Sequence, residues 1–152
     1  MSAISTYSIN RYLERQKIFA WGGATLENVC RAVCETRAEK LPDPAVMGSA
    51  GSFFMNPVVS EEKAAQLLSL YPQMPQYKVP DGVKLSAGWL IEQCGWKEKP
   101  HERVGVYKHQ ALVVVNRGGA TGADIVKFAT EVCSSVQERF GVELKMEVNV
   151  IG

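Results

Sequence analysis

The chain has 152 residues, a net charge of +1, 46% hydrophobic residues and 22% charged residues. This length suits one domain with a sizeable core, and the composition is that of ordinary globular proteins. The near-neutral charge gives no indication of a nucleic-acid groove or of binding to an anionic membrane. The longest apolar run, Ala111–Val115, is too short to span a bilayer, and the N-terminus lacks a secretory pattern. We therefore expect a cytoplasmic protein without nucleic-acid or membrane partners.

The sequence contains four cysteines, at positions 30, 34, 94 and 133. Cys30 and Cys34 are four residues apart in a helical pattern, and no second cysteine or histidine pair has zinc-site spacing. In a reducing compartment, isolated cysteines usually serve as small apolar packing residues. We therefore expect packing roles for the four cysteines rather than metal or redox roles.

The N-terminal segment, residues 1–23, is the least readable part of the chain. Ile9, Tyr12 and Leu13 fit one face of a helix, and Trp21-Gly22-Gly23 interrupts the pattern. We expect a stub or linker over residues 1–23 and a domain over residues 24–152.

A helix is predicted after Thr25, which is a good N-cap for an apolar side of Leu26, Val29, Cys30 and Val33. Pro42 and Pro44 end this helix and force an extended segment. Lys40 therefore leaves the helix just before a rigid Pro-x-Pro linker. Either it is an ordinary solvated lysine or it binds an anion.

The stretch Gly48–Pro57 combines small residues and glycines with two phenylalanines and Asn-Pro. Glycine allows conformations that a Cβ forbids and lets a ligand approach main-chain N–H groups. The stretch is either a tight turn before a buried strand or a loop that presents a hydroxyl to a substrate. A strand over 53–59 follows in either interpretation, and Ser60 then caps a helix.

The middle of the chain predicts short elements. Tyr77–Val79 is a strand, Pro80–Gly82 is a turn, and Ser86 caps a short helix that Gly95 ends. The charged loop that follows contains His101, which is either a plain exposed residue or a chemical group.

Two strands are expected over 104–107 and 111–115, joined by a polar turn over 108–110. Thr121 and Asp124 then resemble a capping box, and the helical pattern that follows ends at Gly141. Residues 142–150 alternate strictly between apolar and polar, which predicts a one-sided strand. The elements lack a regular βαβ rhythm. We therefore expect a single compact α+β domain, with a mixed or antiparallel sheet packed against helices.

General catalytic motifs are absent: the sequence has no dinucleotide fingerprint, P-loop, nucleophile elbow or His-Glu-x-x-His pattern. From the residues alone, the sequence indicates an α+β domain with a serine in a glycine-rich stretch and an acidic strand face.

Three blocks in order carry a more specific signal. They are Lys40-Leu-Pro-Asp-Pro with Gly48-Ser-Ala-Gly-Ser-Phe-Phe-Met-Asn-Pro57, then Lys84-Leu-Ser-Ala-Gly-Trp-Leu-Ile-Glu-Gln-Cys94, then Phe140-Gly-Val-Glu-Leu-Lys-Met-Glu-Val-Asn-Val-Ile-Gly152. Together they resemble the C-terminal half of UDP-N-acetylenolpyruvoylglucosamine reductases, over residues 25–152. The resemblance implies a flavoenzyme of peptidoglycan precursor synthesis. Such an enzyme uses FAD and NADPH to convert UDP-N-acetylenolpyruvoylglucosamine to UDP-N-acetylmuramate.

The resemblance also implies two catalytic residues. Adding hydride to one vinyl carbon of the substrate leaves its neighbour in need of a proton, and the family's donor serine matches Ser52. A serine hydroxyl is a weak acid, so its geometry and neighbouring charge have to activate it. The family's partner glutamate matches Glu147, which could stabilise the enol or act as an alternative acid. Glu143 is the competing carboxylate on the same predicted strand face.

Four substrate-binding positions follow from the same resemblance. The family's pyrophosphate-contacting lysine matches Lys40, and the asparagine before the proline matches Asn56. A further lysine matches Lys97, and a glutamine matches Gln110. Two cations and two amides suit a nucleotide-sugar diphosphate.

The chain also departs from the family pattern. Glu98 and Pro100 stand where many members have Gly and an Ile-Gly-Gly block, Met55 often corresponds to lysine, and Ser49 often corresponds to asparagine. The lobe that holds most of the FAD has no counterpart here, so the chain alone should bind no FAD and reduce nothing. The alternatives are a catalytically inactive module that binds a UDP-sugar, or a protein such as a flavin-binding lobe, and a plain α+β interaction domain.

Overall fold

The computed structural model describes residues 21–99 and 103–151. The chain divides into two units, one ending at Lys40 and the other beginning at Leu41. The helix pattern of Ile9, Tyr12 and Leu13, and the loop residue His101, lie outside the described residues.

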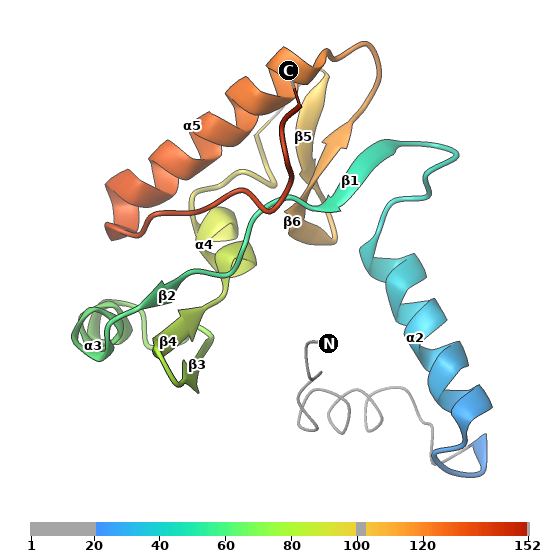
Figure 1. Cartoon of the computed structure of the whole chain (residues 1–152), viewed down its shortest axis with the longest axis horizontal. Coiled ribbons are helices and arrows are strands. Elements are labelled where there is room, and N and C mark those ends of the chain that lie inside the picture. Colours follow the sequence, from blue (N-terminus) through green and yellow to red (C-terminus); the bar gives the residue numbers. More distant parts are fainter. Residues whose placement is uncertain (1–20, 100–102, 152) are drawn as a thin grey trace. The chain divides into compact units, whose positions relative to one another are not determined.

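Among the described residues, helix α2 is the regular element of the first unit, and nine elements belong to the second (Figure 1). The bounds are α2 Leu26–Lys40, β1 Gly48–Ser52, β2 Val58–Val59, α3 Glu61–Leu70, β3 Gln76–Val79, β4 Gly82–Leu85, α4 Ala87–Gln93, β5 Val104–Tyr107, β6 Gln110–Asn116 and α5 Gly122–Phe140.

Helix α2 begins as predicted, because the Asn28 N–H donates to Thr25 Oγ1 at 3.2 Å. Its predicted apolar side, however, is not buried. Leu26 is 90% exposed and Val33 is 46% exposed, and Ala32 is the buried residue of this helix. The helix therefore depends on capping and local propensity more than on burial within the described residues.

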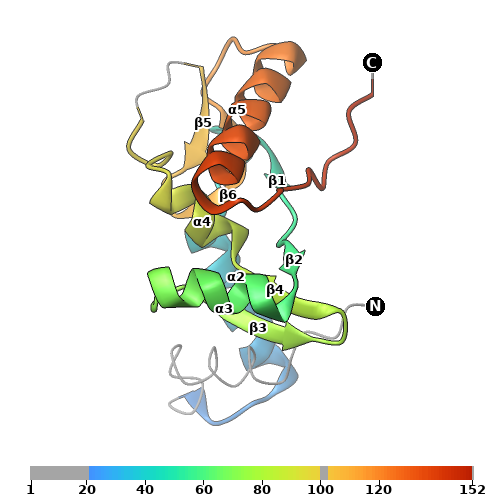
Figure 2. The ribbon, with the colours of Figure 1, turned by 90° about the vertical axis from the view of Figure 1, so that its left-hand side faces the viewer.

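The second unit contains two three-stranded antiparallel sheets, β1-β6-β5 and β2-β4-β3. Helix α5 lies across the first sheet (Figure 1), and α3 lies along the second sheet (Figure 2). Helix α4 lies between them, and Tyr71, Trp89 and Phe140 join α3, α4 and α5 through edge-to-face and tilted ring contacts. The predicted α+β class with antiparallel pairing is confirmed.

The helix caps lie at the residues that the sequence predicts. Ser60 Oγ accepts from the Lys63 N–H, and Ser86 Oγ accepts from the Trp89 N–H. Thr121 and Asp124 form the predicted capping box, and Gly141 ends α5 with φ +61°. These local signals fix where the helices begin and end.

The glycine-rich stretch is itself a strand, so the expected turn was wrong, and of the strand expected over 53–59 only Val58–Val59 forms one, as β2. Residues 48–52 form β1 and pair with β6, with an irregularity near Gly51, whose φ is +77°. The Phe53 N–H still donates to the Leu112 carbonyl of β6 at 2.7 Å, and Phe53 and Phe54 then bury their rings in the core. Pro57 lacks an N–H, and pairing resumes only at Val58. The segment 53–57 is thus extended but largely unpaired by neighbouring strands.

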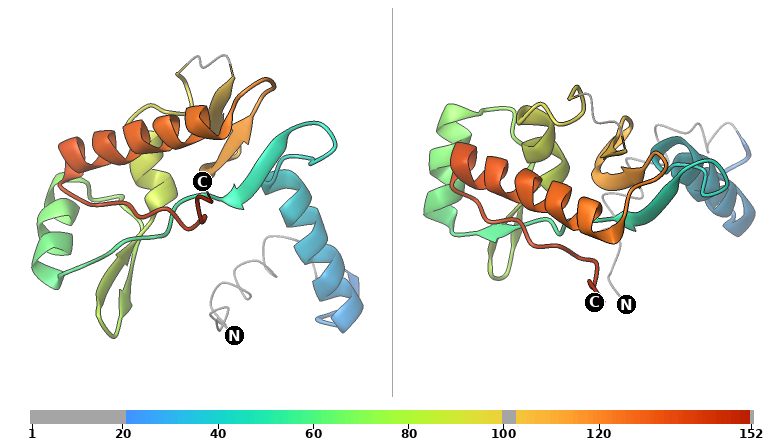
Figure 3. Two further views of the ribbon diagram at one scale, coloured as in Figure 1. Left: turned by 45° about the horizontal axis from the view of Figure 1, so that its top comes forward. Right: turned by 90° about the horizontal axis from the view of Figure 1, so that it is seen from above.

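The prediction of a last strand over residues 142–150 was also wrong. The segment forms one isolated bridge, Phe54 to Met146, and otherwise runs as an extended segment that contacts residues 53–55 (Figure 3). The alternation itself is present at its start, since Val142 and Leu144 are buried while Glu143 and Lys145 are exposed. The apolar period therefore predicted the buried positions, but it could not predict that backbone pairing would be lost.

The expectation that the cysteines have packing roles holds for two of the four. Cys94 and Cys133 are half-buried and pack against the core, whereas Cys30 and Cys34 are exposed on α2. Burial raises the pKa of the Cys133 thiol. Within the described residues, no helix is long and apolar enough to cross a membrane.

Candidate functional site

Ser52 is the last residue of β1 and is exposed. Gly51, immediately before it, takes a left-handed conformation and has open space where a Cβ would project. The Ser52 hydroxyl has no hydrogen-bond partner among the described residues. The bulge at Gly51 therefore presents a free hydroxyl at the edge of the first sheet.

Glu147 lies on the extended segment that runs past Ser52. Its N–H donates to the Phe53 carbonyl at 2.8 Å, so the backbone of Glu147 is adjacent to the residue that follows Ser52. The Glu147 side chain is exposed and forms no ion pair within the described part of the chain. The structure thus places both predicted catalytic residues on two hydrogen-bonded segments.

Asn56 links this extended segment to α4. Its Oδ1 accepts the Ala87 N–H at 2.9 Å, across 31 residues of sequence. Its Nδ2 donates to no acceptor among the described residues. One end of the amide therefore holds the fold together, and the other end is available to a ligand.

Gln110 approaches the same end of α4. Its Oε1 lies 3.1 Å from the point where a Cβ on Gly88 would sit. Asn56 and Gln110 therefore both lie beside the first turn of α4, although Asn56 comes from the segment between β1 and β2 and Gln110 comes from β6.

Lys97 lies elsewhere. Its ammonium is 2.5 Å from Glu92 Oε1, and Glu92 belongs to the last turn of α4. A seven-residue helix is about 10 Å long, so Lys97 lies roughly that far from Asn56. Lys40 is exposed at the end of α2 in the other unit. The structure brings Asn56 and Gln110 together and does not bring Lys97 to them.

The second sheet carries a further exposed group beside Asn56. Val58, Lys84 and Tyr77 are directly opposite one another on three neighbouring strands, so their side chains share one face. Val58 is 46% exposed, Tyr77 is 55% exposed, and Lys84 is exposed. We call these three residues the outer row. It offers an aromatic ring, a cation and an apolar surface two residues from Asn56.

Sequence reasoning missed Lys84 and Tyr77, although a signal was present. Tyr77 lies in a predicted strand that leads into the Pro80-Asp81 turn. Val83, Lys84 and Leu85 alternate in the way of a half-buried strand, with Lys84 facing outwards. Reading the two strands as a hairpin pairs Lys84 with Tyr77.

Comparison with known proteins gives a family match. The model of the UDP-N-acetylenolpyruvoylglucosamine reductase C-terminal domain matches residues 43–151. The chain belongs to this family. A Bacteroides fragilis UDP-N-acetylenolpyruvoylglucosamine reductase is 48% identical over 146 residues, covering 95% of this chain and 44% of the relative.

Other reductases of the same name agree. The protein from Porphyromonas gingivalis is 49% identical over 145 residues, which are 95% of this chain and 42% of the relative. The protein from Chromobacterium violaceum is 55% identical over 121 residues, which are 79% of this chain and 36% of the relative. The chain thus spans less than half the length of these relatives.

Among the described residues, a hollow of about 670 Å³ lies beside Phe53 and Val148 and along the start of α5. Its lining is mostly apolar, and Lys127 and Asn149 are the polar side chains that it offers to a flavin diphosphate. No group of three or more His, Cys, Asp or Glu side chains suited to a metal occurs among the described residues.

Proposed function

We propose that this chain is the substrate-binding and proton-donating lobe of a reductase that converts UDP-N-acetylenolpyruvoylglucosamine to UDP-N-acetylmuramate. FAD, reduced by NADPH and held mainly by a lobe outside this chain, supplies the hydride. The family match supports this proposal, as do the names of the relatives.

One structural observation carries the proposal. The extended segment 52–58 connects the Ser52 hydroxyl at one end to the outer row at the other. Six residue steps of extended chain span about 20 Å, which is on the scale of a nucleotide diphosphate sugar. An aromatic ring suits the base, and a cation with an amide suits the diphosphate. A hydroxyl near a carboxylate suits the enolpyruvyl end.

In this arrangement, the chain's own residues orient the substrate and move one proton. Lys84 and Asn56 Nδ2 hold the diphosphate, and Gln110 lies within the same group. The Ser52 hydroxyl gives its proton to the substrate carbon that needs it. Glu147 stabilises the enol or serves as the alternative acid. Lys40 and Lys97 remain candidate phosphate ligands, and binding through them requires movement of Lys97 away from Glu92.

Titration of the chain with UDP-N-acetylglucosamine tests the binding part. We expect amide NMR shifts at Asn56, Lys84 and Tyr77, and at Lys40 if that lysine takes part. Inorganic phosphate at equal concentration serves as the control, because it lacks the base and the sugar. An unperturbed spectrum at millimolar nucleotide sugar would reject a binding lobe.

Replacing Ser52 tests the chemical part in a complete enzyme, in which this lobe is joined to a flavin lobe. Ser52→Ala should lower turnover by about a hundred-fold or more, which is the scale of a general acid, and should leave flavin binding unchanged. Ser134→Ala, which removes an exposed hydroxyl from α5, is the matched control. If turnover survives the loss of the Ser52 hydroxyl, Ser52 is only a structural residue of the bulge.

The second candidate is an inactive module that binds a UDP-sugar without chemistry. The chain's coverage of less than half of each relative favours it for this chain on its own. Purification with and without a flavin lobe distinguishes the two, because only the joined protein should show flavin absorbance. A yellow preparation of the 152-residue chain would contradict the absence of a cofactor site.

A further inference from the structure

A hollow of about 410 Å³ lies where two extended segments diverge. It is lined by residues 55–59 on one side and by Gly141, Val142, Glu143 and Lys145 on the other. We call it the fork hollow. Its lining includes two charged residues, Glu143 and Lys145, and Asn56. The proposed function assigns no role to Lys145.

Lys145 is held at the closed end of the fork. The Met55 N–H donates to the Lys145 carbonyl at 2.8 Å, next to the bridge between Phe54 and Met146. In antiparallel pairing this places Met55 and Lys145 directly opposite each other on one face. Cβ atoms at such positions are about 5 Å apart. The side chains of Met55 and Lys145 therefore occupy neighbouring space.

The Lys145 side chain is uncommitted. It is exposed, and no carboxylate lies within ion-pair distance of its ammonium among the described residues. This holds although Glu143 and Glu147 stand two residues away on either side. Lys63 is the other nearby cation, and its ammonium lies 2.9 Å from where a Gly141 Cβ would project.

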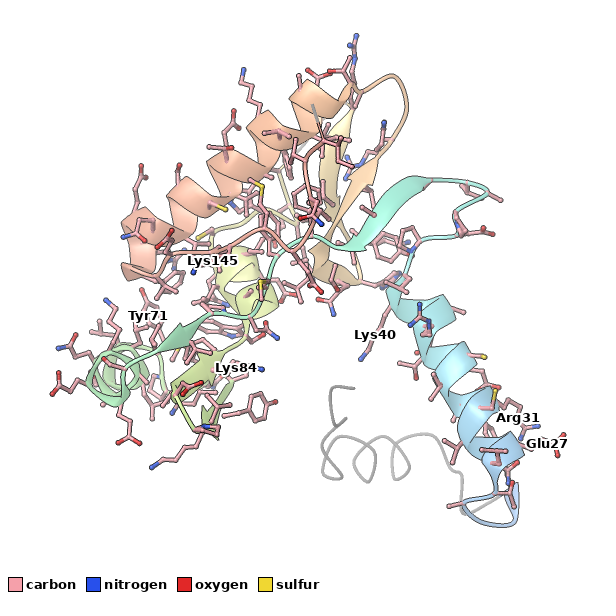
Figure 4. The ribbon with its side chains drawn as sticks, in the orientation of Figure 1. Glu27, Arg31, Lys40, Tyr71, Lys84 and Lys145 are labelled. Carbon is pink, nitrogen blue, oxygen red and sulfur yellow. The ribbon has the colours of Figure 1, made fainter. Side chains whose placement is uncertain are left out.

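Lys145 and Lys84, both labelled in Figure 4, lie opposite the two ends of the segment 55–58, which contains Asn56. Lys145 is opposite Met55, and Lys84 is opposite Val58. Three residue steps of extended chain separate these positions, which is about 10 Å. Because side chains alternate along an extended chain, positions three steps apart face opposite sides of it. Lys145 and Asn56 nevertheless line the same fork hollow, so a ligand there can meet both.

We propose that Lys145 is a second cation that positions the diphosphate of the nucleotide sugar. Lys145 comes from the C-terminal segment, whereas Lys84 comes from β4. The inference rests on the proposed function, since it places a new residue in that substrate site. Two negative phosphates pass beside Glu143 and Glu147, and a cation between these carboxylates offsets their repulsion. Lys145 thus makes the acidic C-terminal segment able to accept an anionic ligand.

The test compares UDP with uridine as ligands of the 152-residue chain, by NMR titration. Lys145→Gln should weaken UDP binding by about five-fold or more and leave uridine binding unchanged, because only UDP carries the charge that lysine contacts. Lys127→Gln removes the same charge from α5 and should change neither. Amide spectra of the free proteins confirm that each variant is folded.

A rescue variant makes the test specific to the cation. In Lys145→Gln with Met55→Lys, a lysine returns from the directly opposite position, and UDP affinity should recover most of its loss. A purely structural role of Lys145 predicts no such recovery.

The outcomes separate the inference from the proposed function. Unchanged UDP binding in Lys145→Gln, or equal losses for UDP and uridine, overturns the role of Lys145. If Asn56→Asp weakens UDP in the same series while Lys145→Gln does not, the proposed site stands without Lys145. If the wild-type chain does not bind UDP, both the proposed function and the role of Lys145 are rejected.

Discussion

The Asn56 amide makes a contact within the fold through one atom and, in the proposed site, offers the other atom to the substrate. Its Oδ1 accepts the N–H of Ala87, a fully buried residue, while its Nδ2 is free among the described residues. The two functions of the amide can therefore be separated by substitution.

We expect Asn56→Ala to lower the free energy of unfolding by about 1–3 kcal/mol, because the Ala87 N–H loses its partner in a buried position. Asn56→Asp keeps an acceptor oxygen and should retain stability, yet it should weaken binding of UDP-N-acetylglucosamine. Urea unfolding and NMR titration of the two variants check this. Equal stability of both variants would show that water replaces the lost acceptor.

Gln76 carries a buried polar atom without a partner in the described part of the chain. Its Oε1 is buried and has no hydrogen-bond partner within the described residues. Replacing an unsatisfied polar atom with an apolar group of similar shape removes a desolvation cost. Gln76→Met should therefore raise the free energy of unfolding by about 1 kcal/mol.

The exposed loop residue Gln73 provides the matched control for Gln76. Gln73→Met makes the same chemical change in solvent, and it should leave the urea midpoint unchanged. A destabilised Gln76→Met would indicate that an ordered water satisfies the Gln76 carbonyl.

At the scale of elements, capping residues predicted the helix ends correctly, whereas the alternation of apolar and polar residues over 142–150 predicted a strand that does not form. The caps at Ser60, Ser86 and Thr121 were all predictable, because an N-cap depends on a few neighbouring residues. Residues 142–150 alternate like a strand, but strand formation also needs a paired neighbour along the whole length. That neighbour, the segment 53–59, turns away after Met55.

The same distinction explains what was missed in the site. Ser52, Glu147, Asn56 and Gln110 came from a family resemblance, which carries no information on distances. The structure adds that Asn56 and Gln110 meet at α4 and that Lys97 is paired with Glu92. Lys84 and Tyr77 depend on cross-strand register, which becomes visible only once the hairpin is recognised.

The start of α5 gives a pH-dependent prediction. The Thr121 N–H and hydroxyl both donate to Asp124 Oδ2 at 2.8 Å. The backbone hydrogen bond, followed by that of the side chain, holds the pKa of the Asp124 carboxyl below its usual 3.8. Because the folded pKa is depressed, this contribution is present above pH 3.8 and is lost as the pH falls through the folded value.

Asp124→Asn should therefore be less stable than the wild type at pH 7, and the difference should shrink as the pH approaches 3. Urea unfolding across this range measures it. Asp81→Asn, on the exposed turn before β4, is the control and should show no such convergence. A constant difference between wild type and Asp124→Asn at all pH values would assign the effect to packing rather than to charge.

At the scale of the whole molecule, burial is distributed unevenly between the two units. Nearly all buried apolar residues of the described chain belong to the unit that begins at Leu41, whereas α2 contributes only Ala32. By contrast, α5 buries five residues, which are Phe128, Ala129, Val132, Val136 and Phe140. Helices with little burial open at low free-energy cost.

Limited trypsin digestion should therefore cut first in or directly after α2, at Arg31, Arg37 or Lys40. The product that begins near Leu41 should survive and keep a cooperative melting transition close to that of the intact chain, because the buried core is intact. Amide hydrogen exchange gives a second measurement, with α2 exchanging well before α5. Protection of α2 equal to that of α5, or loss of the transition after cleavage, would mean that α2 stabilises the substrate lobe. In that case, a site built on residues 41–151 alone would be incomplete.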